Sequence, residues 1–418
     1  LAAAQRRYRV VPWPYDWRAS VFDTALRLRT DLQALAAQYP GTPVHLLAHS
    51  MGGLVARAAL FGPVAGAKAA DPANANATAN ANANANANAN APAVDPAAQT
   101  LWADLKRRGS RLLMLGTPNL GSYAPVQLLV QQHALSHLLA TLARKVTPED
   151  LARWGGQFIG LMQMLPRQAD PVYGDLFEIN TWHALRADDS LAQLPALDTL
   201  RQARVFRSWR DQQFQTLQDE PQALYVAGSG ATPCALCKPG QTGIAAGEGS
   251  AMPVSAGVRF ASSPEGDGVV TWSSRMRPER TWYVDCEHGD LADNTDAFGA
   301  YFELLDVGRT KALPQTAPWR RDGSRAAPRG SLWRRTAPYN WAHQADRADQ
   351  PLATGLLAPP LQLPSLPADL GAYVLGLHGS VLRPAAALPI DVRIVHGGLD
   401  YARFPLIVGH YQNDGILG

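Results

Sequence analysis

Ser50 lies in a segment whose small residues and spacing suit a nucleophilic serine. The segment, Ala48–Gly52 (AHSMG), joins a short apolar run at residues 44–48 to an apolar stretch that begins at Gly52. A sharp strand-to-helix turn strains the serine backbone, and small residues two positions away on either side relieve the crowding. Such a turn exposes the Ser50 hydroxyl at a helix N-terminus, where the dipole favours negative charge. The backbone N–H of Met51 is then placed to donate to an oxyanion.

A serine nucleophile needs a general base and an acid that orients this base. His288 follows the apolar run at residues 280–284, and Asp267 lies earlier, in a loop flanked by glycines. We expect His288 to take the Ser50 proton as a base and to return it as an acid. We expect Asp267 to fix the tautomer of His288, because its glycine neighbours let the loop bend towards the histidine. Four other acids compete with Asp267 for this role: Glu265, Asp285, Glu287 and Asp290.

The sequence also predicts the elements that would position these residues. Strands are expected at residues 8–11, 44–48, 111–115, 223–227 and 280–284. Helices are expected at residues 20–39 and 52–60, where apolar residues recur at near-helical spacing. Strands that alternate with helices imply right-handed crossovers and an α/β fold with a parallel sheet. Apolar stretches within residues 123–215 predict a helical cap that is inserted between strands.

The composition excludes several classes of protein. Hydrophobic residues make up 46% of the 418 residues, so the chain is not disordered as a whole. A formal net charge of +3 gives no indication of nucleic-acid binding. The three cysteines exclude a disulfide scaffold and fit a reducing compartment, so we expect a cytoplasmic protein. Since no apolar run approaches the roughly 20 residues that a transmembrane helix needs, we expect no transmembrane segment.

Changes in composition divide the chain. Residues 1–310 are predicted to form the main α/β core, and a near-perfect Ala-Asn alternation at residues 71–96 predicts a disordered insertion in it. Residues 311–367 are rich in Pro and Arg and are predicted to be a linker. Residues 368–418 are predicted to begin a further module. Because the first residue is Leu1 and the last residue interrupts an element, we expect a piece of a longer protein.

Five short motifs occur in a fixed order along the chain. They are Tyr15–Arg18 (YDWR), Ala48–Gly52 (AHSMG), Leu115–Ser122 (LGTPNLGS), Glu265–Val269 (EGDGV) and Glu287–Leu291 (EHGDL). Together they resemble the lecithin–cholesterol acyltransferase-like and related lipase branch of the α/β-hydrolases, over residues 8–300. The resemblance implies an α/β-hydrolase fold, a catalytic triad of Ser50, Asp267 and His288, and esters or lipid acyl groups as substrates. We expect neither a metal nor another cofactor.

The resemblance also implies that residues 123–215 form a lid over an acyl pocket. Candidate lining residues are the apolar side chains of Phe158, Leu161, Met162 and Leu165, together with Trp154 and Met164. Ordinary packing between helices is the alternative for most of them. In this branch a glycine-rich loop after an early strand, upstream of the YDWR motif, supplies the second oxyanion donor. Because no such loop precedes Tyr15 here, we expect a partial α/β-hydrolase sheet that lacks its early strands.

The tail of the chain has a second, weaker resemblance. Residues 392–411 are similar to a segment that precedes caspase-like CHAT modules in large bacterial proteins, and strands are expected at residues 390–395 and 404–408. His396 and His410 lie in this tail. We interpret both as structural, because no cysteine follows Cys286 that could pair with them in catalysis.

Two further motifs have both a structural and a functional interpretation. Cys234 and Cys237 form a lone CxxC pair in a predicted loop. A structural zinc site needs four ligands, and reactive pairs lie at helix N-termini, so we assign neither metal nor redox function to this pair. Ser122 could line the site, but a role in capping a helix is favoured.

The sequence therefore favours a serine esterase or lipase-like hydrolase that forms an acyl-enzyme on Ser50. Transfer of the acyl group to an alcohol instead of water would make it an acyltransferase, and a thioesterase or peptidase would use the same three residues. A hypothesis from another class is a non-catalytic or regulatory module that uses the hydrolase fold within a large bacterial multidomain protein. We expect an ester or lipid substrate, no nucleic-acid partner, and covalent continuity with further domains.

Overall fold

A parallel sheet of four strands forms the centre of the molecule. The computed structural model describes residues 2–63, 94–132, 147–239 and 257–317. The strands are β1 (Leu46–His49), β2 (Leu112–Leu115), β3 (Ala223–Ala227) and β6 (Thr281–Tyr283). They lie in the order β1-β2-β3-β6, and each pair is parallel. The predicted α/β fold with a parallel sheet is thereby confirmed.

The central strands β2 and β3 are buried on both faces, whereas Leu47 of the edge strand β1 is exposed. Successive side chains of a strand point to opposite sides of the sheet. All four residues of β2 are buried. Leu112 and Met114 pack in one apolar cluster, with Tyr225 of β3. Leu113 and Leu115 pack in another, with Trp282 of β6. This is the pattern expected for a parallel sheet that has helices on both sides.

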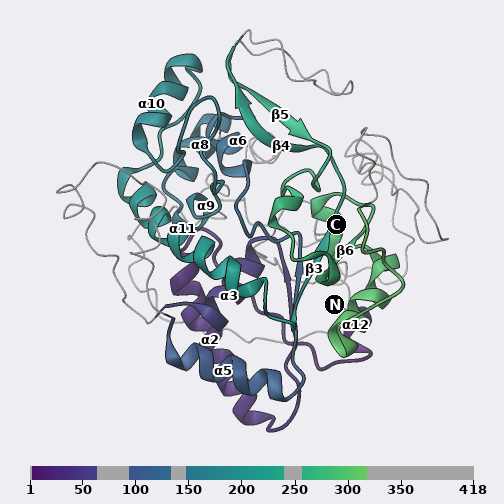
Figure 1. Cartoon of the computed structure of the whole chain (residues 1–418). Coiled ribbons are helices and arrows are strands. Elements are labelled where there is room, and N and C mark those ends of the chain that lie inside the picture. The colour runs from purple at the N-terminus through teal and green to yellow at the C-terminus, as the bar shows by residue number, and fades with distance from the viewer. Residues whose placement is uncertain (1, 64–93, 133–146, 240–256, 318–418) are drawn as a thin grey trace, which may run out of the picture.

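Different helices cover the two faces (Figure 1). The cluster around Met114 receives side chains from α2 (Val21–Gln38), α3 (Met51–Phe61) and α5 (Pro96–Arg107). The cluster around Trp282 receives side chains from α12 (Phe298–Val307). A short helix, α1 (Ala2–Gln5), precedes them in the chain. The predicted helices at residues 20–39 and 52–60 correspond to α2 and α3, whereas α5 and α12 were not predicted.

A helical region connects β2 to β3. It contains α6 (Ala124–Leu129), α8 (Pro148–Gly155), α9 (Ile159–Met162), α10 (Ile179–Asp188) and α11 (Leu197–Leu217). These helices gather beside the hairpin of β4 (Thr232–Cys237) and β5 (Arg259–Ser263), which is antiparallel (Figure 1). Short 3-10 helices complete the fold at η2 (Trp272–Ser274), η3 (Pro278–Arg280), η4 (His288–Ala292) and η5 (Thr295–Ala297). The observed helices agree with the helical character predicted for residues 123–215.

The N-terminal segment differs from its prediction. Residues 8–11, which lie in the described part of the chain, form no strand. Instead, the Tyr8 hydroxyl donates a hydrogen bond to Asp306 Oδ1 on α12, at 2.6 Å, and its ring packs edge-on against Phe302. Side-chain contacts to α12 therefore hold this segment in place of pairing with β1.

Three other predictions can be compared with the structure in part or not at all. Cys234 and Cys237 lie on strand β4 and not in a loop. The predicted Ala-Asn insertion at residues 71–96 falls outside the described residues except at its end, where the Asp95 side chain caps α5 and Pro96 begins it. The predicted linker is described only for residues 311–317, and the further module at residues 368–418 lies outside the described residues.

Candidate active site

Ser50 occupies the turn between β1 and α3 in a strained backbone conformation. Its φ of 51° and ψ of −128° place it in a backbone region that residues other than glycine rarely adopt. Its N–H donates to the carbonyl oxygen of Leu115 on β2 at 2.8 Å, which fixes the turn against the neighbouring strand. Gly53 lets the start of α3 lie close to Thr117, because a Cβ on Gly53 would lie 1.9 Å from Thr117 Oγ1. The predicted strand-to-helix turn is therefore present at Ser50.

His288 follows β6 and begins η4, where its ring reaches both other candidate residues. Its Nε2 lies 2.8 Å from Ser50 Oγ, and its Nδ1 lies 2.8 Å from Asp267 Oδ2. Its own N–H donates to the backbone oxygen of Asp267 at 2.7 Å. The residues Ser50, Asp267 and His288 are only 4%, 2% and 6% exposed, so their hydrogen bonds are shielded from water.

Asp267 is oriented by the backbone that follows it. Its Oδ1 accepts hydrogen bonds from the N–H groups of Val269 at 3.0 Å and Val270 at 2.7 Å. Oδ2 is thereby turned towards His288. Gly268 adopts a φ of 98°, which favours glycine, and its N–H donates to Thr232 Oγ1 of β4 at 2.8 Å. The flanking glycine thus has the bending role that the sequence suggested.

The acids that competed with Asp267 lie elsewhere. Asp285 accepts a hydrogen bond from Ser229 Oγ at 2.7 Å. Glu287 is the N-cap residue of η4, and its side chain is exposed. Asp290 lies further along η4, where burial raises its pKa and the charge of Asp293 adds to the shift. Among the described residues, Asp267 is the carboxylate that contacts the His288 ring.

Gly116 forms a wall of the site that the sequence analysis did not identify. It has a φ of 56° and follows β2 directly. A Cβ at this position would lie 2.9 Å from both Asp267 Oδ2 and His288 Nδ1, and 2.8 Å from Leu291 Cδ1. Only glycine leaves room for the acid and the histidine to meet. Its place directly after a buried strand was the available signal.

Ser122 links the same loop to the acid. Its Oγ donates to the Val269 carbonyl oxygen at 2.7 Å and accepts from the Ala124 N–H at 3.0 Å. Ser122 is therefore not the N-cap of α6, which is Tyr123, although it accepts from the first N–H of that helix. It also braces the loop that carries Asp267.

The predicted oxyanion donor lies beside the nucleophile. Met51 is the first residue of α3, where a backbone N–H has no acceptor within the helix. The predicted lining residues Phe158, Leu161, Met162 and Leu165 are buried in the same apolar cluster as Met51, with Met164 and, partly buried, Trp154. A Cβ on Gly160 would lie 2.7 Å from Met51 Cε, so this segment packs against the start of α3. Contact of these side chains with a substrate stays a prediction.

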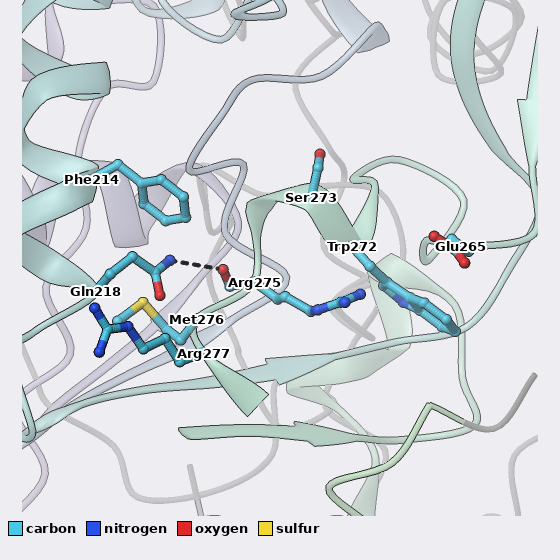
Figure 2. Close-up of a pocket in the computed structure, with 8 residues that line it drawn as sticks. All are labelled: Phe214, Gln218, Glu265, Trp272, Ser273, Arg275, Met276 and Arg277. Carbon is cyan, nitrogen blue, oxygen red and sulfur yellow. Dashed lines mark hydrogen bonds between the residues drawn. The ribbon is translucent and has the colours of Figure 1, made fainter. Parts of the chain in front are cut away.

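A shallow cavity of about 380 Å³ lies beside Glu265 and the residues that follow the acid loop. Its lining includes none of the three candidate residues; Figure 2 shows the lining side chains, which are Phe214, Gln218, Glu265, Trp272, Ser273, Arg275, Met276 and Arg277. The floor is tied to the loops of the site, because Trp272 Nε1 donates to the Gly228 carbonyl oxygen at 2.8 Å.

Two searches of the described residues complete this picture. No cluster of three or more His, Cys, Asp or Glu side chains there is arranged to hold a metal ion. None of the helices in the same ranges has the length and apolar character needed to span a bilayer.

Comparison with known proteins gives one match. A family model described as Lecithin:cholesterol acyltransferase matches residues 4–192. This part of the chain is similar to that family. The match includes Ser50 and the loop at Gly116, whereas Asp267 and His288 lie beyond it. No curated protein and no solved structure matches the chain. The similarity supports a relationship to lipid acyltransferases and lipases, and it does not bear on the resemblance of residues 392–411 to the segments before CHAT modules.

Proposed function

We propose that the protein is a serine hydrolase that cleaves carboxylic esters with an apolar acyl part, through an acyl-enzyme on Ser50. The observation that carries the proposal is the chain of two 2.8 Å hydrogen bonds from Ser50 Oγ through the His288 ring to Asp267. A nucleophile, a base in contact with it and an acid that orients the base are the three parts that acyl transfer to serine requires.

The first half of the reaction forms the acyl-enzyme. His288 Nε2 takes the proton of Ser50 Oγ as this oxygen attacks the ester carbonyl carbon. Asp267 holds the proton on Nδ1 and stabilises the imidazolium that forms. Negative charge develops on the carbonyl oxygen, and the N–H of Met51 at the positive end of α3 donates to it. His288 then gives its proton to the leaving alcohol, and the ester bond breaks.

The second half releases the acyl group. Water, or an acceptor alcohol, loses its proton to His288 and attacks the acyl carbon. The bond from this carbon to Ser50 Oγ then breaks, His288 returns the proton to Oγ, and the acid or the new ester leaves. We assign the acyl part of the substrate to the apolar side chains of Phe158, Leu161, Met162 and Leu165, because they belong to the same apolar cluster as Met51. The match of residues 4–192 to the lecithin:cholesterol acyltransferase family supports a lipid acyl group as the natural substrate.

Labelling with a fluorophosphonate tests the proposal directly. The full chain should be labelled at Ser50, identified by peptide mass spectrometry, and should hydrolyse a p-nitrophenyl ester. The Ser50→Ala variant should lose labelling and at least about 10⁴-fold in kcat. A protein that is folded but neither labelled nor active would instead favour the non-catalytic module. Addition of an acceptor alcohol, with detection of the new ester, separates an acyltransferase from a hydrolase.

We also infer a reducing, cytoplasmic location as part of a multidomain polypeptide. Cys234, Cys237 and Cys286 are all free thiols, which supports a compartment in which disulfides do not form. Fractionation of cells that express the full gene tests the location, and the size of the expressed polypeptide tests the continuity with further domains.

A further inference from the structure

We propose that His49 is a positioning residue for His288, which it holds through the backbone carbonyl. This inference rests on the proposed function and adds to it a residue that neither the motifs nor the family match assigns to catalysis. His49 Nε2 lies 2.9 Å from the carbonyl oxygen of His288. A carbonyl oxygen only accepts hydrogen bonds, so Nε2 carries the proton and donates it.

The contact completes a clamp on the backbone of the proposed base. On one side, the His288 N–H donates to the Asp267 carbonyl oxygen at 2.7 Å. On the other side, the His288 carbonyl oxygen accepts from His49. Both peptide groups that flank the His288 side chain are therefore tied, which fixes the direction in which its ring leaves the backbone.

His49 is well placed for this task because it directly precedes Ser50 in the chain. It is the last residue of β1, and its strand pairs with β2 up to this position. The ring of His49 also packs against the ring of His288, with centroids 4.9 Å apart and planes inclined by 40°. The same strand end therefore sets both the nucleophile and the position of the base that must reach it.

The reacting atoms must be held within a fraction of an ångström, and a misplacement of about 1 Å can cost about 100-fold in rate. His288 lies on a short 3-10 helix, η4, which has poorer hydrogen-bond geometry than an α-helix. A side-chain clamp on its first carbonyl therefore restricts a segment that its own hydrogen bonds hold weakly.

Two amide substitutions at His49 distinguish the effect of its Nε2–H donor from the effect of the rest of its side chain. Gln places its side-chain N–H near the position of Nε2, whereas the shorter Asn places it near Nδ1, out of reach of the carbonyl. In the full chain, His49→Asn should lower kcat for a p-nitrophenyl ester about 10-fold or more, with KM within about twofold of wild type. His49→Gln should restore kcat to within about threefold of wild type.

Equal kcat values for the two variants would overturn the inference, whether both are normal or both are impaired. If the Asn variant does not fold, His49→Phe replaces it, because Phe keeps a ring and lacks the donor; His49→Phe equal to His49→Gln would again overturn it.

A spectroscopic measurement keeps this test separate from the test of the proposed function. The His288 Nδ1 proton that bonds to Asp267 should give a low-field ¹H NMR resonance in wild type and in His49→Gln. The resonance should be lost or broadened in His49→Asn, and its retention there would contradict the clamp. If wild type is labelled by fluorophosphonate but the two variants match, only the role of His49 fails. If wild type is not labelled, the proposed function fails, and the resonance alone decides whether His49 positions His288.

Discussion

The strand-end loops and the helical region between β2 and β3 are held in place by different means. In the loops, hydrogen bonds between backbone groups fix the residues of the site. The Ser50 N–H donates to the Leu115 carbonyl oxygen, and the His288 N–H donates to the Asp267 carbonyl oxygen. In the helical region, buried side chains make the connections. Gln163 Oε1 accepts from the Val21 N–H at 2.7 Å, and Arg210 Nη1 donates to the carbonyl oxygens of Gln163 and Leu165.

This difference has a physical consequence. Backbone hydrogen bonds survive most side-chain substitutions, so the loops depend on a few residues with special conformations or chemistry. A buried side-chain anchor is lost with a single substitution, and its partner is left unsatisfied. We therefore expect substitutions in the loops to change activity, and substitutions of the anchors to change stability.

The largest effect is expected at the acid. Asp267→Asn should lower kcat about 10⁴-fold, because the amide favours the wrong tautomer of His288. The matched control is Glu287→Gln, which removes an exposed carboxylate next to His288 and should stay within about threefold of wild type. Steady-state kinetics on a p-nitrophenyl ester measure both variants. A comparable loss in the control would move the role of the acid away from Asp267.

Gly116→Ala should give the next largest effect. Its Cβ would force Asp267 and His288 apart, since it would lie 2.9 Å from an atom of each, so kcat should fall about 100-fold. Gly109→Ala is the control, because Gly109 also has a positive φ, of 84°, but no atom within 4 Å of an added Cβ. The control should lose about 1 kcal/mol of stability and no activity. Equal activities for the two variants would remove Gly116 from the site.

Substitution of the anchor Gln163 should instead lower stability and leave activity nearly unchanged. Gln163→Ala should lower the free energy of unfolding by about 1–3 kcal/mol, because the buried Val21 N–H loses its acceptor. Activity per folded molecule should fall by less than about threefold. Gln168→Ala, at an exposed position of the same region, should change neither quantity. Urea unfolding and active-site titration measure the two effects, and a large loss of activity without a loss of stability would break the distinction between loops and anchors.

The smallest effect concerns the cysteines of one strand-end loop and of strand β4. Burial raises the pKa of the Cys286 thiol, in the loop before His288, to about 12. The thiolate is the reactive form, so Cys286 should resist iodoacetamide at pH 8 in the native protein, whereas Cys234 and Cys237 on β4, which are less buried, should react before it. Alkylation at Cys234 should leave activity unchanged. Peptide mass spectrometry after timed labelling measures the order, and early reaction of Cys286 would indicate that the loop opens.

The same contrast explains how much could be predicted from the sequence. The turn at Ser50, the four strands of the sheet, all of which precede His288, and the choice of Asp267 follow from local patterns. Small residues and glycines report backbone conformation directly. The prediction of a strand at residues 8–11 was wrong, because the Tyr8 side chain contacts α12 and the segment forms no strand.

Side-chain partners that are far apart in the sequence could not be predicted. Gln163 and Val21 are separated by 142 residues, and no local pattern in either segment specifies the other. The contact between His49 and the His288 carbonyl spans 239 residues and is equally invisible in the motifs. Gly116 was within reach of the sequence, because a glycine directly after a buried strand suggests a close approach of other groups.

The hydrogen bond between Ser50 and His288 also bears on the time at which the protein becomes reactive. The two residues are 238 positions apart, so the ribosome completes and exposes the strained serine turn well before it has made the base. Until β6 pairs with β3 and brings η4 over β1, the serine has no group to accept its proton. Under the proposed chemistry, the growing chain therefore stays unable to cleave the esters around it until residues 281–288 have been made and β6 has paired with β3.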